Sequence, residues 1–182
     1  MLSNLPLFLT WLRILIIPVI VWSFYQNTAW SPALSAGLFI FAGITDWADG
    51  YFARLWKQES RFGAFLDPVA DKLIVAVVLI LIVEREATMW MTLSACIIIG
   101  REIIISALRE WMAESGKRSK VAVAYIGKVK TAAQFVALSC LLYNQDLWGL
   151  PIRQIGFIAL AIATLLTVVS MLQYLISAFR NQ

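Results

Sequence analysis

The sequence has 182 residues, of which 61% are apolar, and a net charge of +4. That apolar share does not fit an ordinary soluble domain, in which it is about 45–50%. A helix needs about 20 apolar residues to cross a membrane, so the chain has room for roughly six spans and little else. With no histidine, acid–base chemistry falls to Asp, Glu, Lys, Tyr or a bound water. We expect residues 1–182 to form a single membrane domain.

Apolar runs separated by Pro, Gly or charged clusters predict an all-α polytopic membrane protein with six transmembrane helices. A short N-terminal interfacial helix, Leu2–Phe8, is expected to lead into the first span. The predicted spans in chain order are Thr10–Tyr25, Ala33–Arg54, Gly63–Val83, Thr88–Met112, Val121–Tyr143 and Ile155–Phe179.

Lys and Arg alternate between the connections of these spans. The even-numbered connections are basic, whereas the first has no basic residue and the third and fifth have one each, Arg85 and Arg153. Because cytoplasmic loops carry the excess of Lys and Arg, we expect both termini and the basic connections on the cytoplasmic side of the membrane.

Four of the five aspartates lie within 26 residues, in DWADGYFARLWKQESRFGAFLDPVAD. Helical periodicity places one group of residues on a single face at the end of the second span, namely Asp46, Asp49, Gly50, Ala53 and Arg54. It places a second group on one face at the start of the third span, namely Gly63, Asp67 and Asp71. The short connection makes these spans antiparallel neighbours, so the carboxylates can meet just below the membrane surface.

Four unpaired carboxylates would repel one another, so a cation is expected among them, and oxygen ligands favour Mg²⁺ or Mn²⁺. Two such ions can polarise a phosphoryl group and stabilise its leaving oxygen. Gly50 and Gly63 leave room for a ligand, and Arg54 can contact phosphate in a bidentate manner. Acidic residues at span ends often serve only to flank the membrane interface. Four aspartates on two facing helices, with an arginine beside them, instead favour a metal site for a phosphate-bearing ligand.

The pattern D-x-x-D-G-x-x-A-R, eight residues, then G-x-x-x-D-x-x-x-D resembles the signature of the CDP-alcohol phosphotransferases at every fixed position. The resemblance implies a six-span fold, usually homodimeric, that cleaves a CDP-linked donor and releases CMP. Asp46, Asp49 and Asp67 would be metal ligands, and Asp71 would be a ligand and the general base. The CDP site would include Asp49, Gly50, Ala53, Arg54 and Gly63.

Three stretches outside the motif resemble the bacterial phosphatidylglycerophosphate synthases: Asn4–Arg13, Arg101–Ala113 and Gly127–Gln134. In the first, Leu7 replaces an Asn that is usual in that family. The resemblance implies CDP-diacylglycerol as donor and glycerol 3-phosphate as acceptor. Because that acceptor is a dianion, its pocket should contain cations, and the candidates are Arg101, Arg109, Lys128 and Lys130. Glu102 or a bound phosphate would be the partner of Arg101.

Two alternatives stay open at this point. The first is a transferase of the same family that uses serine, inositol phosphate or phosphatidylglycerol as acceptor. The second is an ion-coupled or metal transporter, which also holds carboxylates between helices. Transporters place their sites near the bilayer midplane, often within repeated or broken helices, whereas these acids lie at helix ends and the chain has no visible repeat. No nucleic-acid partner is expected.

Overall fold

The computed structural model describes residues 5–26, 28–56, 61–114 and 125–180. These residues form six helices and no strand, which confirms the all-α prediction. The helices are α1 (Leu5–Phe24), α2 (Ser31–Trp56), α3 (Arg61–Glu86), α4 (Met89–Glu114), α5 (Tyr125–Tyr143) and α6 (Ile152–Arg180). Leu5–Phe8 are the first residues of α1, and the residues before them lie outside the described ranges. A separate interfacial helix therefore stays a prediction.

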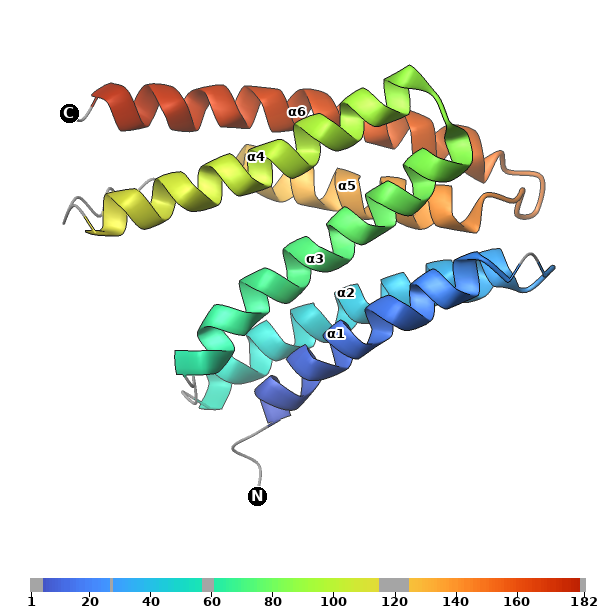
Figure 1. The fold of residues 1–182 in the computed structure, drawn as a ribbon, viewed down its shortest axis with the longest axis horizontal. Coiled ribbons are helices and arrows are strands. Elements are labelled where there is room, and N and C mark those ends of the chain that lie inside the picture. The colour runs from blue at the N-terminus through green and yellow to red at the C-terminus, as the bar shows by residue number, and fades with distance from the viewer. Residues whose placement is uncertain (1–4, 27, 57–60, 115–124, 181–182) are drawn as a thin grey trace.

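The helices form two groups with α3 crossing between them (Figure 1). α1 packs against α2 and α3, α2 packs against α5, and α4 packs against α3 and α6. The starts of α1, α3 and α5 and the ends of α2, α4 and α6 lie at one end of the bundle, called here the aspartate end. Successive helices therefore run in opposite directions, as the alternation of basic and non-basic connections predicts.

Small residues set the approach of α2 to α5. Gly43 lies against the ring of Phe135, and a Cβ at this glycine would come within 2.3 Å of that ring. The same ring stacks on Phe39 of α2, with 5.2 Å between centroids. A larger residue at position 43 would require the Phe135 ring to move, so the glycine allows this ring to pack closely against α2.

The outside of the bundle is apolar and part of its inside is polar. Exposed aliphatic side chains include Leu15, Ile80, Ile158 and Leu165, whereas buried positions include Thr10, Arg13 and Ser170. A continuous apolar exterior is unfavourable in water and suits lipid. By length and composition, the segments Met89–Met112 and Ile152–Ile176 could each cross a membrane. The prediction of six helices is confirmed, and six membrane crossings remain a prediction.

Candidate functional site at the aspartate end

Three of the four motif aspartates converge at the aspartate end, as helical periodicity predicts. Asp46 lies on α2, and Asp67 and Asp71 lie one turn apart on α3. Their side chains are 38–48% exposed, so each carboxylate remains accessible from outside the protein. Gly63, one turn before Asp67, is buried. The predicted meeting of the two helix faces is present.

A cation from α1 lies between these carboxylates. The Nη1 atom of Arg13 is 2.9 Å from Asp46 Oδ1 and also contacts Asp71 Oδ1, while Nη2 is 4.0 Å from Asp67 Oδ1. Thr10, one turn earlier on α1, donates a hydrogen bond to Asp67 Oδ1. Three helices are therefore joined by one charge network, as the positions of α1, α2 and α3 allow (Figure 1).

Arg13 is on the interior stripe of α1. Thr10, Arg13, Ile17 and Ile20 follow one another at helical spacing and are all buried, with Arg13 only 1% exposed. The sequence prediction missed Arg13 and Thr10 as site residues. A single charge within the apolar run Leu5–Phe24 was the available signal, because a guanidinium in such a helix requires an acidic partner from elsewhere.

The donor set fits a divalent cation in its chemistry. All three carboxylates surround one positively charged group, and oxygen donors of this kind suit Mg²⁺ or Mn²⁺. Within the described part of the chain, no group of three acidic or cysteine side chains could hold a metal ion as it stands. The side chain of the fourth predicted ligand, Asp49, lies outside the described residues.

Other predicted residues also lie outside the described side chains. The backbones of Gly50, Ala53 and Arg54 belong to α2, and those of Arg109 and Lys128 belong to α4 and α5. Their parts in a CDP site and in an acceptor pocket therefore stay predictions. Arg101 and Lys130 are described.

Arg101 and Lys130 meet at one carboxylate inside the bundle. Arg101 Nη1 is 3.1 Å and Lys130 Nζ is 2.6 Å from Oε1 of Glu102. Both cations are buried, with exposures of 8% and 4%. Of the two partners predicted for Arg101, Glu102 or a bound phosphate, the structure shows Glu102, which is shared with Lys130. Two cations buried at this depth need a nearby carboxylate, because desolvation of an unpaired cation is costly.

Further groups from α3 and α6 extend this cluster. Arg101 Nη2 lies 3.4 Å from Ser170 Oγ, and its guanidinium carbon lies 5.7 Å from the centroid of the Tyr174 ring. Lys72, which follows Asp71 in α3, donates to Ser106 Oγ of α4. We call Lys72, Arg101, Glu102 and Lys130 the basic cluster. It carries three cations and one carboxylate, which is an excess of positive charge suited to an anion.

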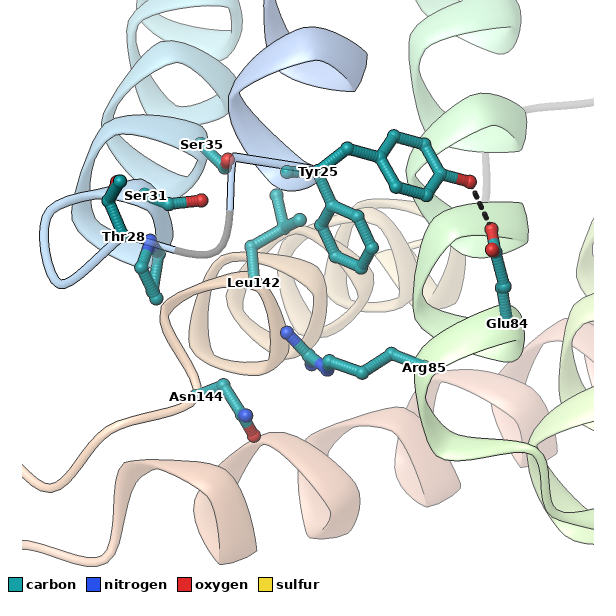
Figure 2. Close-up of a pocket in the computed structure, with 10 residues that line it drawn as sticks. Tyr25, Thr28, Ser31, Ser35, Glu84, Arg85, Leu142 and Asn144 are labelled. Atoms are coloured by element: carbon teal, nitrogen blue, oxygen red, sulfur yellow. Dashed lines mark hydrogen bonds between the residues drawn. The ribbon is translucent and has the colours of Figure 1, made fainter.

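A pocket of about 420 Å³ opens at the opposite end of the bundle (Figure 2). Tyr25, one residue beyond α1, donates its hydroxyl hydrogen to Glu84 Oε2. Arg85 lies over the Phe24 ring, 5.5 Å from its centroid, and donates to the carbonyl oxygen of Leu141.

The charges at this pocket are balanced within the protein. Glu86 accepts from Arg85 at 3.3 Å and from Arg153 at 2.6 Å. No excess of acid or base is present among the described side chains of the pocket wall and their partners, in contrast to the aspartate end and the basic cluster. The pocket therefore lacks the charge that would attract a metal ion or a phosphate, and the candidate active site is at the aspartate end.

Comparison with known proteins gives one consistent result. Residues 3–169 match the family model described as CDP-alcohol phosphatidyltransferase. A protein from Salmonella choleraesuis (strain SC-B67) is 54% identical over 175 residues, which cover 96% of this chain and 94% of that protein. Proteins from Escherichia coli (strain K12) and Shigella flexneri are each 53% identical over the same length and shares. All three carry the name CDP-diacylglycerol--glycerol-3-phosphate 3-phosphatidyltransferase.

Proposed function

Because the chain belongs to the CDP-alcohol phosphatidyltransferase family, we propose that it transfers the phosphatidyl group of CDP-diacylglycerol to glycerol 3-phosphate. The products are phosphatidylglycerol phosphate and CMP. The convergence of Asp46, Asp67 and Asp71 carries the proposal, in a chain that is 54% identical to a relative with this activity in its name.

The reaction exchanges one phosphoester for another. The acceptor hydroxyl oxygen bonds to the lipid-linked phosphorus, the bond from that phosphorus to the CMP oxygen breaks, and the hydroxyl proton passes to Asp71. Asp71 suits this role because its carboxylate is partly exposed at the aspartate end. The chain has no histidine that could take the proton instead.

Mg²⁺ or Mn²⁺ ions, two per site, would be held by Asp46, Asp49, Asp67 and Asp71. When bound, they supply positive charge that polarises the phosphate and stabilises the leaving oxygen. Gly50, Ala53, Arg54 and Gly63, together with Asp49, would hold the CDP part of the donor. Gly63 lies one turn before Asp67 in α3, and its lack of a side chain would allow close approach of the donor's phosphates.

The basic cluster supports glycerol 3-phosphate as the acceptor. Its phosphate is a dianion, and the three cations of the basic cluster outnumber Glu102, the described carboxylate that Arg101 and Lys130 share. Lys72 links the cluster to the reaction site because it adjoins Asp71 in α3. Arg109 and Lys128 are proposed as further contacts to the acceptor. Serine carries no phosphate and would leave this charge unmatched, which disfavours the serine alternative.

The cellular setting follows from the same features. The protein is proposed to lie in the bacterial inner membrane as a single six-span domain of residues 1–182, with its termini and active site on the cytoplasmic side. A homodimer is proposed as the working assembly. The apolar exterior and the two helical segments long enough to cross a bilayer support the membrane location.

CMP release is expected to depend on a divalent ion. Purified protein in detergent with both substrates should stop releasing CMP when EDTA removes divalent ions, and Mg²⁺ or Mn²⁺ should restore release. Asp46→Asn should not recover at the same metal concentration, because it loses a ligand charge. Glu84→Gln, which alters a carboxylate at the opposite pocket, is the matched control and should keep the wild-type rate.

Continued CMP release in excess EDTA would contradict the metal-dependent mechanism. Metal flux into proteoliposomes without CDP-lipid, together with no CMP release, would favour the transporter instead. The two assays use the same purified protein, so they separate the two classes of function directly.

A further inference from the structure

Arg13 is the only charged residue of α1, and the position of its guanidinium is unusual for an apolar helix. The side chain is 1% exposed and contacts carboxylates from both α2 and α3. A buried charge is tolerated only when partners offset its desolvation, and here Asp46 and Asp71 do so. The function proposed above assigns these two carboxylates to a divalent ion, so Arg13 and the ion require the same oxygens.

We propose that Arg13 is a built-in counterion of the carboxylate cluster, which holds the cluster together in the metal-free protein and competes with the divalent ion for Asp46 and Asp71. This role of Arg13 rests on the proposed metal-dependent function. It assigns to Arg13 a positioning role and an effect on metal affinity that its place in the sequence does not indicate.

The contacts of α1 support competition. Arg13 Nη1 contacts Asp46 Oδ1 at 2.9 Å and Asp71 Oδ1 as well, so one nitrogen lies between the two carboxylates. A second cation in that position would repel the guanidinium strongly, because like charges a few ångströms apart interact strongly away from bulk water. Arg13 must therefore give up these oxygens for an ion to take them.

The same contacts explain how the metal-free protein stays assembled. Without Arg13, the carboxylates of α2 and α3 would face one another with their mutual repulsion uncompensated. Thr10 contributes a neutral hydrogen bond to Asp67, so α1 keeps a contact with α3 that does not depend on the charge of Arg13. Removal of the guanidinium should thus lower the stability of the metal-free protein more than that of the loaded protein.

The test is a titration with Mn²⁺ in detergent without substrates, with free Mn²⁺ followed by electron paramagnetic resonance. Arg13→Gln should bind Mn²⁺ at least about tenfold more tightly than wild type, the scale of one charge-assisted contact. Its metal-free Tm should fall, and saturating Mn²⁺ should recover most of that loss. Arg13→Lys keeps the positive charge and should bind Mn²⁺ with nearly wild-type affinity.

Arg85→Gln is the matched control, because Arg85 is also partly buried, paired with a glutamate and packed on an aromatic ring, but lies at the opposite pocket. Its Mn²⁺ affinity should equal that of wild type. An Arg13→Gln affinity that is unchanged or weaker would overturn the proposal and leave Arg13 a purely structural residue. Absence of Mn²⁺ binding by the wild type would overturn it as well.

A second measurement covers the case in which Arg13→Gln does not fold. In wild-type protein with ¹⁵N-labelled arginine, Mg²⁺ should shift one guanidinium resonance, and that resonance should be missing from Arg13→Lys. No shift on Mg²⁺ addition would overturn the proposal. Neither readout uses CDP-diacylglycerol or turnover, so transfer activity with an unchanged Arg13→Gln affinity would keep the proposed function while rejecting the role of Arg13.

Discussion

Asp71→Asn is expected to abolish turnover while the protein stays folded in detergent. Asparagine keeps the shape of the side chain but cannot accept the acceptor's proton, and loss of a general base typically lowers the rate by about 10²–10⁴-fold. The decrease in rate should appear in kcat, because Asp71 acts on the reacting hydroxyl. The measurement is CMP release at saturating Mg²⁺ and substrates, with folding checked by circular dichroism and gel filtration.

Asp146→Asn is the control for Asp71→Asn. Asp146 is the one aspartate outside the motif and is exposed between α5 and α6. It should keep wild-type activity. A Mn²⁺ titration of Asp71→Asn separates its two proposed roles: retained binding with lost turnover identifies a base, whereas loss of both identifies mainly a ligand. Activity of Asp71→Asn within tenfold of wild type would exclude it as the base.

Arg101→Ala or Lys130→Ala should raise the KM for glycerol 3-phosphate by tens-fold or more, with a much smaller change in the KM for CDP-diacylglycerol. Both cations share Glu102 within the basic cluster, so loss of either reduces the positive charge available to the acceptor's phosphate. A charge-assisted contact to phosphate is worth about 2–3 kcal/mol, which corresponds to this change. Steady-state kinetics with each substrate varied in turn is the measurement.

Arg153→Ala is the matched control for these two variants. Arg153 also pairs with a glutamate, Glu86, at 2.6 Å, but it lies at the opposite pocket, so both KM values should stay at their wild-type levels. Equal increases in both KM values for Arg101→Ala and Lys130→Ala would contradict an acceptor-phosphate pocket. That outcome would assign the basic cluster to the stability of the bundle.

The aspartate site was predictable because helical periodicity determines which residues share a face. Asp67 and Asp71 are separated by one turn, and the short connection to α2 brings Asp46 towards them without any knowledge of the rest of the fold. The pairing of Arg101 with Glu102 was predictable for a similar local reason. A buried arginine needs a carboxylate, and its sequence neighbour supplied one.

Contacts between distant parts of the chain were not predictable in this way. Arg13 lies 33 residues from Asp46 and 58 from Asp71, and only the packing of α1 against both α2 and α3 joins them. Lys130 meets Glu102 across 28 residues for the same reason. The periodicity of a single helix shows which face is buried, but it does not show which face of which helix lies opposite.

Six membrane crossings remain a prediction from composition. Six apolar runs predicted six spans of similar kind, yet length and apolar composition single out only α4 and α6 as clear candidates among the described residues. In α2 and α3 the charged motif occupies the aspartate end of the helix, so part of each helix is not apolar.

The most direct test of the account is CMP release by purified protein in detergent with Mg²⁺ and CDP-diacylglycerol. Glycerol 3-phosphate, serine, inositol phosphate and phosphatidylglycerol are supplied in parallel as acceptors. We expect metal-dependent CMP release with glycerol 3-phosphate alone. Release with another acceptor and none with glycerol 3-phosphate would contradict the assignment of the basic cluster, and no release with any acceptor from folded protein would contradict the proposed transfer itself.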